Sequence, residues 1–190
     1  IAKQAFNTAS TTYTTGWQAK HPGQKTLWRF MGSMLGPHAG PVHDKITDDD
    51  YDDYGATWSP DGSRIAFVSN RTAEPDASSN TDIWLVDPDT PYDQQDPVRV
   101  TTNPGTDDSP IWHPDGERII FASNMDDPTG RDFDLYMINE DGSGQERITF
   151  LDGFDGFPVF SPDGRYLVWG SNRNQAREGE TNVFIAEWVD

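Results

Sequence analysis

The sequence predicts an all-β protein built from repeated antiparallel units, and three observations support this prediction. A motif of the form Trp/Phe-Ser/His-Pro-Asp-Gly occurs three times, beginning at Trp58, Trp112 and Phe160. The copies align without a gap and lie 54 and then 48 residues apart. Each copy is flanked by short runs of β-branched and aromatic residues, which favour strands. Repeats of about 50 residues made of short strands are typical of a β-propeller.

The Pro-Asp-Gly triplet predicts the tip of a hairpin in each unit. Proline fixes φ at the first corner, aspartate bonds to the local backbone, and glycine adopts the positive φ that a tight hairpin needs. In the second unit the triplet at 114–116 follows the apolar pair 111–112 and precedes the apolar run 119–121. We therefore expect the first and second strands of each unit on either side of the triplet.

Two further strands complete each unit. Third strands are predicted at 83–86, 135–138 and 183–186, preceded by Asp82, Asp134 and Asn182 respectively. Fourth strands are predicted at 98–101 and 146–149. Four antiparallel strands make one blade, so the prediction is a β-propeller of four-stranded antiparallel blades, with three clear blades and a degenerate partial one. Because a closed ring needs at least about four blades, the ring is expected to be incomplete in this chain alone.

The chain divides into residues 1–45, a degenerate N-terminal segment or partial blade, and residues 46–190, the three blades. Residues 21–28 resemble the second hairpin tip with its aspartate deleted, which would make 26–30 a second strand. Alternatively 26–30 is a third strand, because 45–47 follows it as a fourth strand would. The third blade lacks a fourth strand before residue 190, and the Thr-rich stretch 11–15 is a candidate to supply it.

Composition limits the classes of partner. The chain has 32 acidic and 14 basic residues, a net charge of −18 and a pI near 4.3. Nucleic acid is not an expected partner, because neutralising phosphates requires clustered Lys and Arg. Turns and a solvated surface account for much of the aspartate. The absence of cysteine excludes disulfides and thiol catalysis, and no apolar run approaches the roughly 20 residues of a membrane span.

No catalytic constellation is evident, and we favour a role other than enzyme. A serine hydrolase of the α/β type needs a Gly-x-Ser-x-Gly elbow followed by Asp and His, and the sequence has no such arrangement. Of the four histidines, His113 occupies the turn position that Ser59 and Ser161 hold in the other repeats. It is therefore interpreted as a turn residue.

The three in-register Pro-Asp-Gly repeats over about residues 46–190 resemble the TolB-like β-propeller family, with its WD-like repeats. The resemblance implies a propeller that is periplasmic or secreted and acts as a non-catalytic module for protein or peptide binding. Similar repeats occur in prolyl-oligopeptidase-like peptidases and oligogalacturonate-lyase-like enzymes. The alternative is thus the propeller portion of a hydrolase or lyase whose catalytic residues lie outside this chain. We also expect a homo-oligomer or the remainder of a larger propeller as partner, because a terminal blade exposes an apolar face.

Three aspartates occupy one register of the repeat. Asp53, Asp107 and Asp155 are predicted to lie in the loop before the innermost strand, near one mouth of the central channel. In one interpretation each caps its own loop through backbone N–H groups. In the other they form an acidic ring that binds a basic peptide or a divalent cation. The acidic stretch 48–53 adds carboxylates beside that ring, and oxygen ligands suit calcium, so calcium is the one cofactor predicted, with these aspartates as its ligands.

Overall fold

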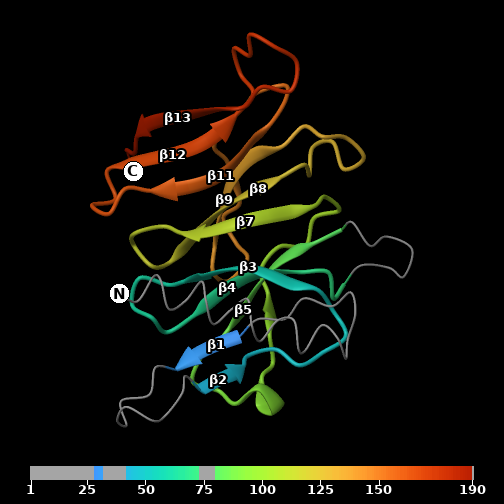
Figure 1. The fold of residues 1–190 in the computed structure, drawn as a ribbon, viewed down its shortest axis with the longest axis vertical. Helices are drawn as coiled ribbons and strands as arrows, with labels where there is room; N and C mark the ends of the chain where they lie inside the picture. Colours follow the sequence, from blue (N-terminus) through green and yellow to red (C-terminus); the bar gives the residue numbers. More distant parts are fainter. Residues whose placement is uncertain (1–27, 32–41, 73–79, 190) are drawn as a thin grey trace.

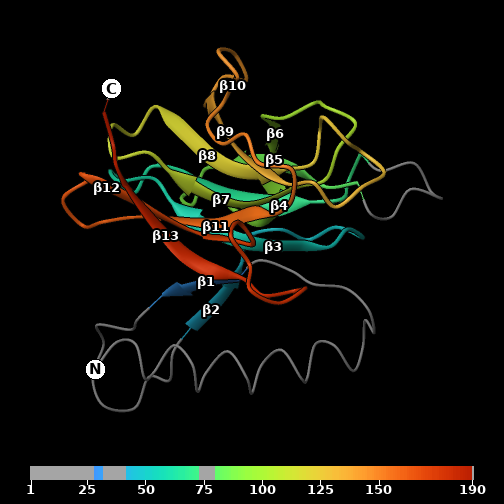
Figure 2. The same ribbon diagram turned by 90° about the horizontal axis from the view of Figure 1, so that it is seen from above.

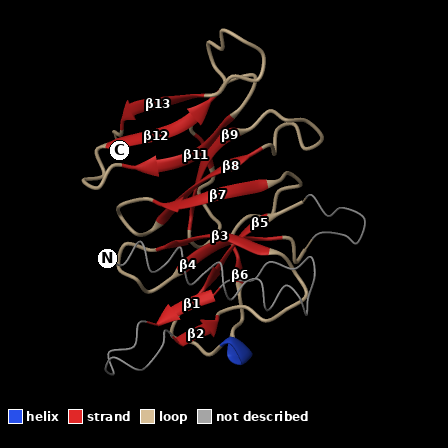
Figure 3. Cartoon of the chain, in the orientation of Figure 1, coloured by secondary structure: helices blue, strands red, loops and turns tan. Residues whose placement is uncertain are grey.

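The computed structural model describes residues 28–31, 42–72 and 80–189, which are all-β apart from one 3-10 turn, Tyr92–Gln94 (Figure 3). The first blade contains β3 (Asp53–Trp58), β4 (Ile65–Ser69), β5 (Asp82–Val86) and β6 (Val98–Arg99). The second contains β7 (Asp107–Trp112), β8 (Arg118–Ser123), β9 (Asp134–Asn139) and β10 (Glu146–Arg147). The third contains β11 (Asp155–Phe160), β12 (Tyr166–Ser171) and β13 (Asn182–Glu187). A separate pair, β1 (Trp28–Met31) and β2 (Val42–Lys45), precedes them.

Each blade is an antiparallel meander of consecutive strands, and the blades succeed one another along the long axis (Figure 1). The first strands β3, β7 and β11 are neighbours, whereas the fourth strands β6 and β10 lie on the other side of the stack (Figure 2). The predicted β-propeller class is confirmed, and the ring is not closed. The fourth strands are shorter than predicted, because only two residues of each pair with the third strand.

The Pro-Asp-Gly triplets form the predicted hairpin tips. Gly62 has φ 77°, and the equivalent glycines of the other two blades match it closely. In the first blade the hydroxyl of Ser59 donates to Asp61 and accepts the amide N–H of Arg64, which closes the turn. His113 lies at the same place in the second blade, buried, with Nδ1 2.9 Å from the Asp115 carboxylate. It is a turn residue, as its position in the repeat indicated.

The apolar core lies between the blades rather than within one sheet. Val68 and Leu85 of the first blade pack against Phe121 of the second. Leu135 of the second blade packs in turn against Trp169 of the third. Alternate residues of a strand point to opposite faces, so each central blade buries one face against the blade before it and the other against the blade after it. This explains why β9 of the second blade is buried along almost its whole length.

The first strand of every blade contains a bulge, and this corrects one sequence prediction. The aspartates predicted to lie in the preceding loop are instead the first residues of β3, β7 and β11. The register shifts two residues later, where the third residue of each strand has a positive φ: Gly55 64°, Ser109 54° and Phe157 57°. The alternation of side chains is interrupted there, so the sequence pattern did not show that pairing begins at the aspartate.

The pair β1–β2 favours one of the two N-terminal alternatives. Trp28 lies opposite Lys45 in this pair, as Trp84 lies opposite Arg99 in the first blade. The register therefore matches a third and a fourth strand. The Thr-rich stretch 11–15 lies outside the described residues. Within the described ranges, no helix has the length and apolar character needed to cross a bilayer.

Candidate functional site

The aspartate column is buried in the blades. In the first blade, Arg71 donates from Nη2 to both oxygens of Asp53, at 3.1 and 3.3 Å. The arginine is held in place, because its Nε donates to the Ser69 hydroxyl at 3.0 Å and its guanidinium lies 4.8 Å from the centre of the Trp84 ring. Asp53 is 2% exposed. It is a neutralised structural carboxylate in this blade.

The third blade repeats this arrangement. Arg173 Nη2 lies 2.5 Å from Oδ2 of Asp155, and Arg173 Nε donates to the Ser171 hydroxyl at 2.9 Å. The other oxygen of Asp155 accepts the indole N–H of Trp169 at 3.3 Å. In both blades the arginine lies two residues beyond the end of the second strand. The same local backbone conformation therefore places the guanidinium group beside the aspartate in each blade.

The second blade lacks the arginine. Met125 stands at that place, and its amide N–H donates to the Ser123 hydroxyl at 3.1 Å, just as the arginine amides do to their serines in the other blades. The backbone is thus conserved between blades while the cation is absent. Asp107 is fully buried, its Oδ2 accepts the Asn103 amide at 2.7 Å, and its Oδ1 has no hydrogen-bond partner in the described part of the chain.

Burial raises the pKa of Asp107 to about 7. The hydroxyls of Ser123 and Thr101 and the amide of Asn103 act in the opposite direction, and the nearby carboxylate of Asp82 adds to the rise. Desolvation outweighs the hydrogen bonds because no positive charge compensates it. A neutral carboxyl group at this position avoids the large cost of a buried unpaired charge.

These contacts bear on the predicted acidic ring. Asp53, Asp107 and Asp155 do occupy equivalent places in neighbouring blades, but all three are buried, and two are neutralised by arginine. No group of three or more His, Asp or Glu side chains is placed to hold a metal ion among the residues that the structure describes. The binding role of the column and the calcium ligation stay predictions, and a ligand would have to displace internal contacts to reach these carboxylates.

A second ion pair joins the fourth strand to the third. Arg99 Nη2 lies 2.9 Å from Asp82 Oδ2 in the first blade, and Arg147 pairs with Asp134 in the second. The sequence pattern had placed an acidic residue before each third strand without assigning it a partner. In the third blade the equivalent residue is Asn182, which is exposed.

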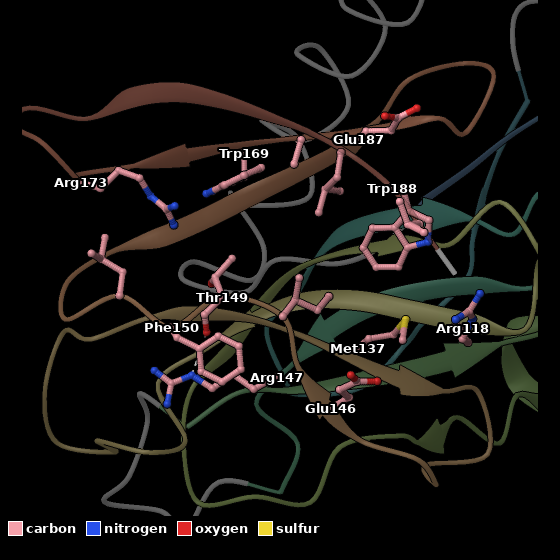
Figure 4. A pocket seen from close by; sticks show the side chains of 15 residues that line it. Arg118, Met137, Glu146, Arg147, Thr149, Phe150, Trp169, Arg173, Glu187 and Trp188 are labelled. Atoms are coloured by element: carbon pink, nitrogen blue, oxygen red, sulfur yellow. Dashed lines mark hydrogen bonds between the residues drawn. The ribbon is translucent and has the colours of Figure 1, made fainter.

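A groove of about 790 Å³ separates the second and third blades. Figure 4 shows Phe150 and Arg147 on one wall, facing Trp169, Arg173 and Trp188 on the other. Ala186, which lines the groove, stands where the second blade has the larger Ile138, which is buried. Its lining is aromatic and carries arginines, although the chain as a whole is strongly acidic.

The edge of β13 adjoins this groove. The third strands β5 and β9 each pair with a fourth strand, whereas no fourth strand pairs with β13 in the described ranges. β13 is largely exposed. Val183 shares the open face of the third blade with Ile185 and is 78% exposed, whereas its counterparts Ile83 and Leu135 are buried against the blade that follows theirs. Phe150, on the opposite wall, is 75% exposed. The groove thus lies beside a strand edge that has no fourth-strand partner in the described ranges.

The blades are antiparallel meanders, and their first strands lie side by side. This arrangement defines the chain as part of a β-propeller. The predicted resemblance to TolB-like propellers is confirmed by solved structures. A protein described as TolB from Agrobacterium tumefaciens is 26% identical, with a TM-score of 0.57 over 77% of this chain and 48% of that protein. TolB from Acinetobacter baumannii is 20% identical, with a TM-score of 0.56 over 77% of this chain and 32% of that protein. The chain therefore spans about half of the Agrobacterium protein and about a third of the Acinetobacter protein.

Propellers of enzymes are also similar in fold. A prolyl endopeptidase is 16% identical, with a TM-score of 0.55 over 88% of this chain and 27% of the enzyme. An oligogalacturonate lyase in complex with manganese is 20% identical, with a TM-score of 0.51 over 78% of this chain and 39% of that protein. No protein-family model matches the sequence, and neither does any curated protein.

Proposed function

We propose that this chain is a non-catalytic TolB-like propeller module that binds a protein or peptide in the groove between its second and third blades. The observation that supports the proposal is the aromatic and arginine-lined groove beside an unpaired strand edge. Aromatic and arginine side chains are enriched at the centres of protein interfaces. The cell envelope or the exterior as location follows from the resemblance alone.

The charges in the groove suit a polypeptide better than a small anion. Arg147 is already paired with Asp126 and Asp134, and Arg173 with Asp155. Their guanidinium groups lie over rings, Arg147 over Phe150 at 5.0 Å and Arg173 over Trp169 at 5.2 Å. The groove therefore offers flat apolar surfaces with compensated charge, which bind side chains and peptide planes.

The test uses a displayed library of random dodecapeptides. We expect the chain to select peptides whose affinity falls about tenfold or more in Phe150→Ser, because an exposed aromatic anchor is lost. Phe157→Ser is the matched control, since Phe157 is 65% exposed but does not line the groove, and its affinity should stay within about twofold of the parent's. Calorimetric titration of the selected peptides measures both. Recovery of no peptide, or an equal loss in both variants, would contradict the proposal.

The open face of the third blade predicts association with a second copy or with the rest of a propeller. Val159, Val168 and Ile185 lie opposite one another across β11, β12 and β13 and so share one face. The equivalent face of the second blade is covered by the third. We expect the 21.3 kDa chain to self-associate with rising concentration, because this apolar face is bare.

Light scattering on Val159→Lys checks this expectation. The lysine should shift the protein to the monomer, since a charge cannot be desolvated at such a contact. Val98→Lys is the control, because Val98 on the first blade is 58% exposed, as Val159 is. A parent chain that stays monomeric at every concentration would disprove association through this face.

The alternative function is the propeller portion of a hydrolase or lyase. It is supported only by the shared fold with the endopeptidase and the lyase, and its catalytic residues would lie outside this chain.

A further inference from the structure

The second blade retains the pair of aromatic rings on which an arginine lies in the third blade. There the Trp169 and Phe184 rings are 6.1 Å apart at an angle of 32°, and the guanidinium carbon of Arg173 lies 5.2 Å from the centre of each. The equivalent rings of the second blade, Phe121 and Tyr136, are 6.0 Å apart at an angle of 30°. The rings therefore have the geometry that holds a guanidinium group, although the second blade lacks the arginine.

The polar groups that complete such a site are also present. Ser69 and Ser171 accept the arginine Nε in the first and third blades, and Ser123 holds the same position in the second. Asp107 is fully buried, and its Oδ1 has no hydrogen-bond partner in the part of the chain that the structure describes. A buried acceptor without a partner costs free energy, so a donor that reached this oxygen would recover that cost.

Met125 lies at the place of the missing arginine and packs against the core cluster that includes both rings. It is half-buried, and its Sδ accepts the side-chain amide of Gln145, an exposed residue, at 3.1 Å. Methionine is unbranched and repacks readily. A change of rotamer at Met125 would therefore lead from solvent to the rings and to the buried carboxylate.

A second guanidinium group is compatible with the charges nearby. Arg147, on the fourth strand of the same blade, is already paired with Asp126 and Asp134. The first blade holds both kinds of arginine at once, because Arg99 pairs with the aspartate of the third strand while Arg71 pairs with that of the first strand. The second blade has the first of these cations and lacks the second.

We propose that the second blade binds an arginine side chain of a partner polypeptide at the place of its missing internal arginine. The incoming guanidinium group stacks on the Phe121 and Tyr136 rings. Two of its nitrogens donate to Asp107 Oδ1 and to the Ser123 hydroxyl. Arginine fits better than lysine, because its planar group stacks on rings and donates in two directions. This site lies where the first and second blades pack together, so it is separate from the groove between the second and third.

A tripeptide titration tests the inference. Acetyl-Gly-Arg-Gly-amide is added to the chain, with isotope-labelled methionine methyl groups, at pH 8, where Asp107 is ionised because its pKa is about 7. The Met125 methyl signal should shift as the side chain leaves the rings, with a dissociation constant on the order of 1 mM. The Met137 methyl, which lines the groove, should not shift. About 0.3 M salt suppresses general attraction to the acidic chain, and the citrulline peptide, which is neutral, should shift neither signal.

Three variants assign the contact. Asp107→Asn should weaken the tripeptide about tenfold or more, because the charged acceptor is lost. Asp141→Asn is the matched control, since it removes one carboxylate from an exposed turn, and its affinity should stay within about twofold of the parent's. Met125→Arg should not bind, because its own guanidinium group fills the site.

Three results would overturn the inference. They are a Met125 signal that does not move, equal losses in the two aspartate variants, and tighter binding of free arginine than of the tripeptide, which would exclude a polypeptide as the occupant. A shift of Met137 alone would place the peptide in the groove instead, so it would overturn this site and support the groove proposal. Failure of the groove proposal is judged separately by Phe150→Ser.

Discussion

Replacing Arg173 by methionine is expected to lower the free energy of unfolding at pH 7 by about 3 kcal/mol. The substitution leaves Asp155, which is fully buried, with only the Trp169 indole as a hydrogen-bond donor among its side-chain contacts. Removing one member of a buried pair costs about 3 to 5 kcal/mol, because an uncompensated charge remains. The lower end applies here, since the Arg173 side chain is partly exposed. Urea unfolding monitored by tryptophan fluorescence measures the change.

Arg165→Met is the control for this prediction. Arg165 pairs with Glu187 at 3.7 Å in the same blade, but both side chains are 63% exposed. An exposed pair contributes less than about 1 kcal/mol, so this variant should unfold close to the parent. Equal losses in the two variants would show that the buried position of Asp155 has no special importance.

Asp107 is expected to make the chain less stable as the pH rises from 5.5 to about 7. Its pKa is near 7 in the folded chain against an ordinary value of 3.8. Between these values the folded chain binds more protons than the unfolded chain, so stability falls with rising pH and levels off above the folded pKa. The slope approaches about 1.4 kcal/mol per pH unit, which gives a total of about 2 kcal/mol over this range.

Two variants isolate this effect. Asp107→Asn removes the titration, and its unfolding free energy should lack the extra slope that the parent shows between pH 5.5 and 7. Met125→Arg supplies the cation that Arg71 and Arg173 supply in the other blades, so it should raise stability at pH 8 by about 2 kcal/mol. Identical pH profiles for the parent and Asp107→Asn would refute the prediction.

The repeats predicted the blades well because the conformation of each hairpin tip is determined by the residues of the turn itself. Pro-Asp-Gly specifies its turn without help from distant residues, so the boundaries beside the tips agree with the observed strands. The start of the first strand could not be placed in the same way. There the bulge at Gly55 and its equivalents breaks the alternation that marks a strand.

The register of the aspartates was predicted, but their partners were not. A signal was present, because the residue after each Ser-Asn is Arg71, Met125 and Arg173 in the three copies. Reading this column would have predicted two neutralised carboxylates and one without a cation. The groove had no comparable signal, since its lining residues come from two different blades and meet only through tertiary packing.

The meander topology has a consequence for how the protein is made. Because every sheet is built from consecutive strands, most contacts that define a blade are local in sequence, and local contacts form quickly. A blade leaving the ribosome can therefore fold before the next one is synthesised. Its trailing apolar face then becomes the surface on which the following blade assembles, as Leu135 does for Trp169. Synthesis in this direction leaves an unfinished apolar surface at the most recently made blade.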